Sequence, residues 1–280
     1  MPSAALLRLQ IETALSDRIP SALTPVPRVI RPTAPTGIAA LDERLGGGLP
    51  IGAISELTGL ECSGRTSLAL SFVAELTEAG RVCAWVDVSD TLDPESAAAI
   101  GVDLDRLLWV RCAAQPQQLS LPGLANPLCQ LPPAPYSAAK RPLTVRKPWS
   151  RLDQALRATD LLLQAGGFSA IVLDMGSVAP EFALRVPLAT WFRYRAAAER
   201  TQASVVLLTQ QACIKSSAGL VLTFAPGGIS SEGSAVLTGA EFFVDIARER
   251  FAPVTGYMRK PPQSDHRVSW QSHSAWAGLR

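Results

Sequence analysis

Apolar runs alternate with amphipathic stretches along most of the chain, and this alternation predicts strands that are each followed by a helix. Short, nearly continuous apolar runs are typical of strands buried on both faces, whereas apolar positions three or four residues apart are typical of helices. We expect strands at residues 54–58, 82–88, 107–112, 170–174, 205–209 and 242–246, and helices at residues 66–79, 94–100, 152–165 and 180–201. The expected fold class is therefore α/β, with a mostly parallel twisted sheet and helices on both faces.

Proline-rich stretches divide the chain into three parts. Residues 1–35 are expected to form an amphipathic helix at 4–18 and then a proline-rich arm. The α/β core is expected at residues 36–250, with a proline-rich irregular insertion at 113–149. Residues 251–280 read as a polar tail with little periodicity.

Composition narrows the class of protein without naming a function. The chain has 280 residues, of which 48% are hydrophobic, enough for one α/β domain with extra segments. It contains no apolar run near the roughly 18 residues that a membrane span needs and no secretory signal pattern. We therefore expect a cytoplasmic protein that has no membrane partner. The five cysteines form no C-x-x-C pair, which favours reduced, buried thiols over a disulfide or metal site. A net charge of +2 neither requires nor excludes nucleic acid.

The segment between the first core strand and its helix fits a phosphate-binding loop at every fixed position but one. The pattern is G-x-x-x-x-G-K-[ST], and the residues are Gly59, Leu60, Glu61, Cys62, Ser63, Gly64, Arg65, Thr66 and Ser67. In such a loop, backbone N–H groups surround phosphate oxygens at a helix N-terminus. The Thr66 hydroxyl would face Mg²⁺, but the lysine position holds Arg65. We expect ATP and Mg²⁺ as cofactors, with weakened binding.

A second feature fits the same chemistry. The apolar strand at 170–174 ends in Asp174, and a carboxylate at the end of a buried strand can hold Mg²⁺ through water. An apolar strand that ends in aspartate is common by chance. One that follows a phosphate-binding loop by about a hundred residues is much stronger evidence for a nucleotide site. The alternative interpretation is an ordinary glycine-containing turn at 59–66.

Several strings of residues resemble the RecA recombinase family. Residues 36–42 and 46–52 look like the lead-in to its first core strand, 61–66 resembles E-S-S-G-K-T, and 92–94 and 100–108 are similar to L-D-P and L-G-V-D-x-x-x-L-L. The resemblance covers residues 36–250. It implies a RecA-like P-loop core in which Asp174 is the Mg²⁺ aspartate. It also implies that Gln210 is the glutamine that senses the γ-phosphate and relays to a DNA-binding loop.

Two departures from that family bear on catalysis. The family's D-A-E glutamate, which polarises the attacking water, is replaced here by Ser89, and a serine hydroxyl cannot act unaided as a general base at neutral pH. Asp87 and Asp90 are nearby substitutes, although strand alternation points neighbours the wrong way. An arginine at position 65 is a bulkier, planar fork. We therefore expect little hydrolysis and assign no catalytic residue; an active ATPase that uses Arg65 is the alternative.

Candidate DNA contacts lie in two regions. The Gly- and Ser-rich segment 212–237 takes the place of the family's second DNA-facing loop and carries Lys215. Arg193 and Arg195 interleave with three aromatic residues of the 180–201 helix, which would suit stacking on single-stranded DNA. The alternative is an amphipathic helix with its aromatic residues in the core. The insertion adds a basic patch at residues 140–147.

By its size, and by its lack of the loop lysine and of the catalytic glutamate, the chain most resembles the ImuA group of RecA relatives. The resemblance implies an accessory factor in DNA repair and damage-induced (SOS) translesion synthesis. The implied partners are an inactive Y-family polymerase-like protein, an error-prone DnaE-type polymerase, RecA and single-stranded DNA. Two alternatives remain: an active DNA-dependent ATPase or recombinase, and a regulatory NTP-binding protein outside repair. The helix at 4–18 would pack on a neighbouring subunit or cap its own domain.

Overall fold

The computed structural model describes residues 31–112, 150–232, 236–250 and 267–273, together with residues 6, 7 and 13. The strands are β1 (Thr33–Ala34), β2 (Leu49–Pro50), β3 (Ile54–Thr58), β4 (Cys83–Asp87), β5 (Leu107–Arg111), β6 (Ala170–Asp174), β7 (Ser204–Thr209), β8 (Leu220–Glu232), β9 (Val236–Glu249) and β10 (Arg267–His273). The helices are α2 (Ala39–Arg44), α3 (Arg65–Glu78), α4 (Pro94–Ile100), α5 (Arg151–Ala165), α6 (Pro180–Ala183) and α7 (Leu188–Thr201), with 3₁₀ turns η1 (Leu104–Arg106) and η2 (Lys215–Ser217). Among these described helices, none has the length and hydropathy that crossing a bilayer demands.

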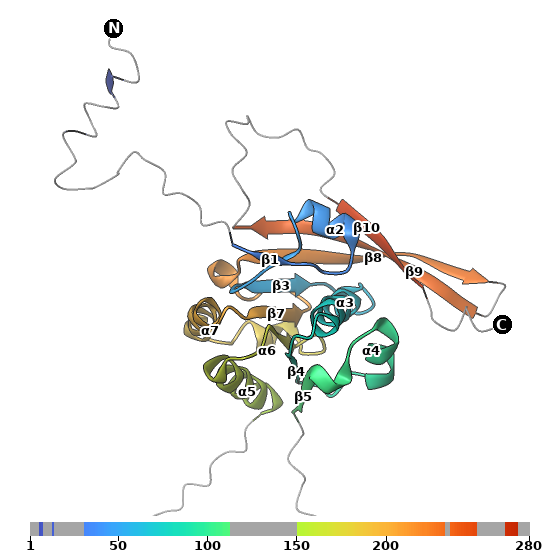
Figure 1. Ribbon diagram of the computed structural model, residues 1–280, viewed down its shortest axis with the longest axis horizontal. Coiled ribbons are helices and arrows are strands. Elements are labelled where there is room, and N and C mark those ends of the chain that lie inside the picture. Colours follow the sequence, from blue (N-terminus) through green and yellow to red (C-terminus); the bar gives the residue numbers. More distant parts are fainter. Residues whose placement is uncertain are drawn as a thin grey trace, which may run out of the picture.

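One eight-stranded sheet forms the centre of the molecule, in the order β10-β9-β8-β3-β7-β6-β4-β5 (Figure 1). The six strands from β8 to β5 run parallel, whereas β9 and β10 are antiparallel to their neighbours. The expected α/β class with a mostly parallel sheet is confirmed. Because parallel strands share one carboxyl edge, the loops that follow β3, β6 and β7 meet there.

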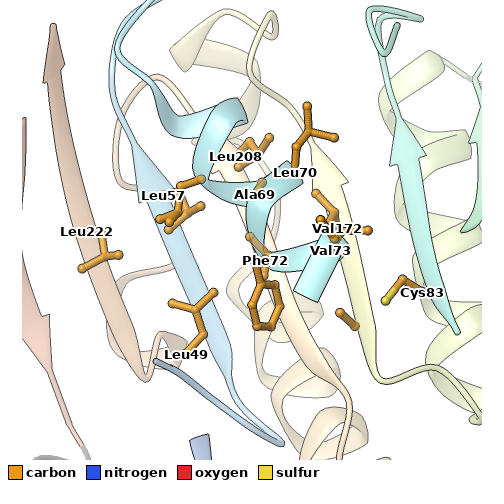
Figure 2. Close-up of a cluster of buried hydrophobic side chains, with 14 of the residues drawn as sticks. Leu49, Leu57, Ala69, Leu70, Phe72, Val73, Cys83, Val172, Leu208 and Leu222 are labelled. Carbon is orange, nitrogen blue, oxygen red and sulfur yellow. The ribbon is translucent and has the colours of Figure 1, made fainter. Parts of the chain in front are cut away.

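Two hydrophobic clusters cover the two faces of the sheet. On one face α3 and α4 pack, and Phe72 of α3 lies over strands that carry Leu57 and Val172 (Figure 2). On the other face α5 and α7 pack, where Trp191 and Leu173 are buried (Figure 1). Strands in the middle of the sheet supply both clusters, which explains their nearly continuous apolar sequences.

Side-chain caps fix where two of the α-helices, α4 and α5, begin. Asp93 accepts a hydrogen bond from Ser96 N, and Pro94 is the first residue of α4. Ser150 and Asp153 form a reciprocal capping box at the start of α5. These caps provide acceptors for N–H groups that the first turn of a helix leaves unpaired.

Two expectations about elements are corrected. The helix expected at 180–201 is two helices, because Pro187 is the N-cap of α7 and proline disfavours helical backbone at the residue before it. The segment expected as a long DNA-facing loop at 212–237 is largely β8, which pairs with β3 and β9. Its Gly- and Ser-rich composition hid the strand because β-propensity is low there.

Three further expectations concern segments that lie partly or wholly outside the described residues. The helix at 4–18 lies mostly outside them, although residues 6, 7 and 13 are helical. The insertion at 113–149, with its basic patch, lies wholly outside them. Past residue 250, residues 267–273 form β10 and pair with β9, so the sheet includes part of the segment that reads as a tail.

Candidate functional site

A cavity of about 670 Å³ lies at the carboxyl edge of the sheet. This volume is in the range of small-molecule sites. Its walls come from the loop after β3, the start of α4, the end of β6 and the β8–β9 hairpin. The lining residues are Glu61, Cys62, Ser63, Gly64, Arg65, Thr66, Ser67, Leu70, Thr91, Leu92, Asp93, Ser96, Asp174, Gly176, Ser177, Pro226, Gly227, Gly228, Ile229, Ala240, Glu241 and Phe242. Of the expected loop residues, all but Gly59 and Leu60 line the cavity.

The loop keeps the shape that a phosphate requires. Gly64 has φ +90° and a Cβ there would lie 2.5 Å from the Phe242 ring, so only glycine fits. A Cβ at Gly59 would lie 2.5 Å from Ser63 Oγ. The Ser63 hydroxyl is buried and has no hydrogen-bond partner among the described residues. Since α3 begins at Arg65, its first N–H groups and this unpartnered hydroxyl fit an anionic oxygen ligand.

Arg65 is turned toward the protein backbone. Its side chain donates from Nη1 to Gly59 O and to Thr209 O (3.0 Å), and from Nη2 to Gly176 O (2.7 Å). The residue is 6% exposed. Burial lowers the pKa of Arg65 from its usual value, while the charge of Asp174 opposes that change. The fork geometry that lets one side chain reach three carbonyls is particular to arginine.

Thr66 and Asp174, the expected Mg²⁺ residues, both line the cavity. Asp174 is 7% exposed, and its Oδ1 accepts a hydrogen bond from Gly176 N at 2.9 Å. Burial raises the pKa of Asp174 to about 6, with the charge of Asp87 adding to the effect. At neutral pH the carboxylate is therefore mostly ionised and fits a divalent cation. Within the described ranges, no cluster of three or more His, Cys, Asp or Glu side chains could hold a metal by itself.

The residues considered for water activation do not face the cavity. Ser89 is absent from the described lining. Asp87 is fully buried and accepts hydrogen bonds from Ser89 N, Thr91 N and Leu92 N. Asp90 forms a two-point ion pair with Arg111. The two aspartates therefore hold the loop after β4, and neither is placed as a general base for a ligand in the cavity.

The β8–β9 hairpin is the part of the site that sequence reasoning missed. It supplies Ile229, Glu241 and Phe242 to the cavity wall. A Cβ at Gly227 would lie 2.7 Å from Glu241 O, so this glycine allows the two strands to approach. Glycine inside a strand is a known signal of close backbone approach, and residues 227–228 carried that signal.

Gln210 and the candidate DNA contacts lie on different parts of the molecule. Nε2 of Gln210 donates to Gly176 O at 3.1 Å, beside the cavity. Lys215 begins η2 and its carbonyl accepts a hydrogen bond from Arg248. The charge of Arg195 lowers the pKa of Arg31 and of Arg250, in each case after the larger effect of burial.

These effects place Arg31, Arg195, Arg248 and Arg250 near one another, and Lys215 joins them through its backbone carbonyl. We call these five residues the basic cluster; within it, Arg31 is ion-paired with Glu199. Arg31 donates to Gly52 O, just before β3, and Arg250 N donates to Gly219 O, just before β8. The cluster therefore lies at the amino edge of the parallel strands, opposite the cavity. Arg193 is apart from it and pairs with Asp160 at 2.9 Å.

The stacking surface expected on α7 is not formed by its aromatic residues together. Trp191 and Tyr194 are buried against α5 and the sheet, whereas Phe192 is exposed. The alternative, an amphipathic helix with aromatic residues in the core, is correct for Trp191 and Tyr194. The segment after Gln210 is also packed, because Cys213 N and Ile214 N donate to the buried Glu56 carboxylate.

Residues 26–123 match the model of the RecA N-terminal domain. The chain is 51% identical to RecA of Crocosphaera subtropica over 76 residues, which are 27% of this chain and 22% of that protein. It is 36% identical to RecA of Brucella anthropi over 143 residues, 51% of this chain and 29% of that protein. It is 53% identical to RecA of Symbiobacterium thermophilum over 75 residues, 26% of this chain and 21% of that protein.

Each of these matches covers less than a third of the RecA protein concerned. The family model covers the loop at 59–67 and the Ser89 position, whereas Asp174 and Gln210 lie beyond it. The mostly parallel sheet is consistent with a RecA-like core. Together, the matches and the fold support the RecA superfamily for this chain.

Proposed function

We propose that this chain is a RecA-like accessory protein of DNA repair that holds a nucleotide weakly and turns it over slowly or not at all. One observation carries the proposal: the cavity keeps the phosphate-binding loop, but the residues expected to activate water do not line it, and the Arg65 guanidinium is held by backbone acceptors. Ser89, Asp87 and Asp90 are absent from the lining, and Arg65 is bonded to backbone carbonyls.

The charges around the cavity support weak binding. Four carboxylates line it, those of Glu61, Asp93, Asp174 and Glu241, and Arg65 is the one cation among the described lining residues. A nucleotide triphosphate carries several negative charges, so its approach is opposed unless a divalent cation accompanies it. Thr66 and Asp174 are the residues that would hold such a cation. When bound, Mg²⁺ would neutralise phosphate charge next to Asp174.

Within DNA repair, we propose more specifically that the chain is an ImuA-like protein. In that role it would act in damage-induced translesion synthesis beside an inactive Y-family polymerase-like protein and an error-prone DnaE-type polymerase. RecA and single-stranded DNA are further proposed partners. The relatives reported above carry the name RecA, and DNA repair comes to this chain from that resemblance.

Hydrolysis of Mg-ATP with and without single-stranded DNA tests the proposal. We expect turnover at the background rate in both conditions, and weak binding of Mg-ATP by calorimetry. Arg65→Lys is expected to tighten Mg-ATP binding without restoring turnover, since Ser89 is unchanged; Arg193→Lys is the matched surface control. DNA-stimulated hydrolysis that Asp174→Ala abolishes would instead establish the active ATPase or recombinase.

The accessory role has its own test. We expect the full chain to capture the purified polymerase-like protein. We also expect a polymerase-like gene beside the gene of this chain. Absence of both would favour a regulatory NTP-binding protein outside repair.

A further inference from the structure

Arg65 and Gln210 share one backbone acceptor. Nη2 of Arg65 donates to Gly176 O at 2.7 Å, and Nε2 of Gln210 donates to the same oxygen at 3.1 Å. Arg65 begins α3, Gln210 follows β7, and Gly176 follows β6. A single carbonyl therefore joins the phosphate-binding loop to the segment that starts at Gln210.

The space around this carbonyl fits the guanidinium closely. A Cβ on Gly176 would lie 2.8 Å from Nη2 of Arg65 and 3.0 Å from Oδ1 of Asp174. Gly176 is not among the glycines with positive φ, so its role is to leave room and not to allow an unusual backbone. Residue 176 has to lack a side chain for Arg65 to lie where it does.

Arg65 also satisfies the ends of two other strands. Nη1 donates to Gly59 O after β3 and to Thr209 O at the end of β7. Thr209 O also accepts a hydrogen bond from Gly59 N, so it is the buried Gly59 O that depends on Arg65, and leaving that carbonyl unpaired would be costly. The positive charge lies near the buried carboxylate of Asp174, and their attraction opposes the desolvation of both groups. The guanidinium thus ties β3, β6 and β7 together at the carboxyl edge.

The segment after Gln210 is fixed at its far end as well. Oε1 of Glu56, in the middle of β3, accepts hydrogen bonds from Cys213 N at 2.6 Å and from Ile214 N at 3.4 Å. Residues 210–214 are therefore held by Gly176 O at one end and by Glu56 at the other. Every one of these contacts is made by the protein itself.

We propose that Arg65 is an internal strut that holds Gln210 and residues 210–214 in one position whether or not a nucleotide is bound. A ligand shifts a conformational equilibrium only through contacts that differ between two states. Since the strut already makes the contacts between the loop and the Gln210 segment, a nucleotide in the cavity does not switch that segment. This inference rests on the proposed function in taking the cavity as a nucleotide site.

Hydrogen exchange of the full chain, measured by mass spectrometry, tests the strut. Without nucleotide, Arg65→Ala and Gly176→Ala are expected to speed amide exchange at residues 175–178 and 209–214 at least about tenfold, because Gly176 O loses the Arg65 donor and keeps only Gln210. Gly176→Ala keeps the arginine and displaces it, so it decides the question if Arg65→Ala does not fold. Arg193→Ala is the control and is expected to leave both segments unchanged.

The nucleotide arm compares exchange with and without Mg-ATP. In the wild type we expect no change at residues 209–214, and in Arg65→Lys we expect exchange there to become sensitive to Mg-ATP. The proposal is overturned if Mg-ATP alters exchange at 209–214 in the wild type, or if both Arg65→Ala and Gly176→Ala leave exchange unchanged. The comparison of Arg65→Ala and Gly176→Ala with the wild type needs no nucleotide. Its outcome is therefore independent of the hydrolysis measurement that tests the proposed function.

Discussion

At the scale of single residues, the exchange of lysine for arginine at position 65 changes where a positive charge is held. An ammonium is a compact charge on a flexible stem, whereas a guanidinium is a planar fork with five donors. In this chain the fork reaches Gly59 O, Thr209 O and Gly176 O, all at the carboxyl edge of the sheet. The residue that would contact phosphates has thereby become part of the scaffold.

Arg65→Ala is expected to lower the free energy of unfolding by about 3 kcal/mol, because buried carbonyls lose a charged donor. Urea denaturation followed by circular dichroism measures this loss. Arg193→Ala is the matched control: Arg193 is largely exposed, and its ion pair with Asp160 contributes much less. An equal loss in the two variants would contradict a structural role for Arg65.

Asp174 gives the stability a pH dependence of known sign. Burial raises its folded pKa from 3.8 to about 6, so between these values the folded state binds more protons than the unfolded state and stability falls as pH rises. We expect the unfolding free energy of the wild type, relative to Asp174→Asn, to increase by about 2 kcal/mol from about pH 7 to about pH 4. Urea denaturation of both proteins across that pH range measures the difference in unfolding free energy. If this difference does not change with pH, the pKa of Asp174 is close to its ordinary value.

At the scale of elements, buried acceptors decide the course of the loops at the carboxyl edge. Asp87 ends β4 and directs the following turn by accepting hydrogen bonds from Ser89 N, Thr91 N and Leu92 N. Glu56 does the same for residues 213–214 from the middle of β3. Polar residues within buried strands thus set loop conformations, which explains why they lie in otherwise apolar runs.

Asp87→Asn is expected to destabilise the fold by about 2 kcal/mol, since an amide NH₂ replaces an acceptor that faces N–H donors. Asp90→Asn removes only an exposed ion pair with Arg111 and should change stability far less. Chemical denaturation of the two variants side by side makes the comparison. If Asp90→Asn proved the more damaging, the assignment of Asp87 as the loop anchor would be wrong.

At the scale of the whole molecule, one sheet carries two hydrophobic clusters on opposite faces. Trp85 belongs to one cluster and Trp191 to the other, and both side chains are essentially buried. Because β3, β4, β6 and β7 contribute to both clusters, loss of packing on one face removes support from the other. The described core should therefore unfold as one cooperative unit.

Phe72→Ala on one face and Leu173→Ala on the other are each expected to cost about 3 to 4 kcal/mol. Both side chains are fully buried. Tryptophan fluorescence and far-ultraviolet circular dichroism should give coincident unfolding transitions for the wild type and for each variant. Two separated transitions would show that the faces unfold independently.

The basic cluster at the amino edge also arises only in the assembled molecule, since its members come from four segments of the chain. Arg195→Ala with Lys215→Ala is expected to weaken single-stranded DNA binding and to reduce the slope of log affinity against log salt by about 1 to 2. Fluorescence anisotropy at several salt concentrations measures this. Arg193→Ala should change DNA affinity little, because Asp160 already pairs with that guanidinium. If Arg193→Ala weakened DNA binding more than the double variant, the DNA contact would lie on the Arg193 side of α7 and not at the basic cluster.

The sequence by itself determined the α/β class, the position of the phosphate-binding loop and the end of β6 at Asp174. Buried parallel strands need continuous apolar runs, and phosphate-binding loops need glycines at fixed spacing, so both leave local patterns. The split of the 180–201 helix at Pro187 was missed, although proline acts on its immediate neighbours and so leaves a local signal.

Tertiary structure alone decided the role of each charged group. Arg65 contacts Thr209 and Gly176, which are more than a hundred residues away, so its orientation depends on acceptors that only the folded sheet brings together. The same holds for β8, whose Gly- and Ser-rich sequence becomes a strand by pairing with β3 and β9. Local pattern fixes what a segment can form, whereas hydrogen-bond partners distant in sequence fix what its polar residues do.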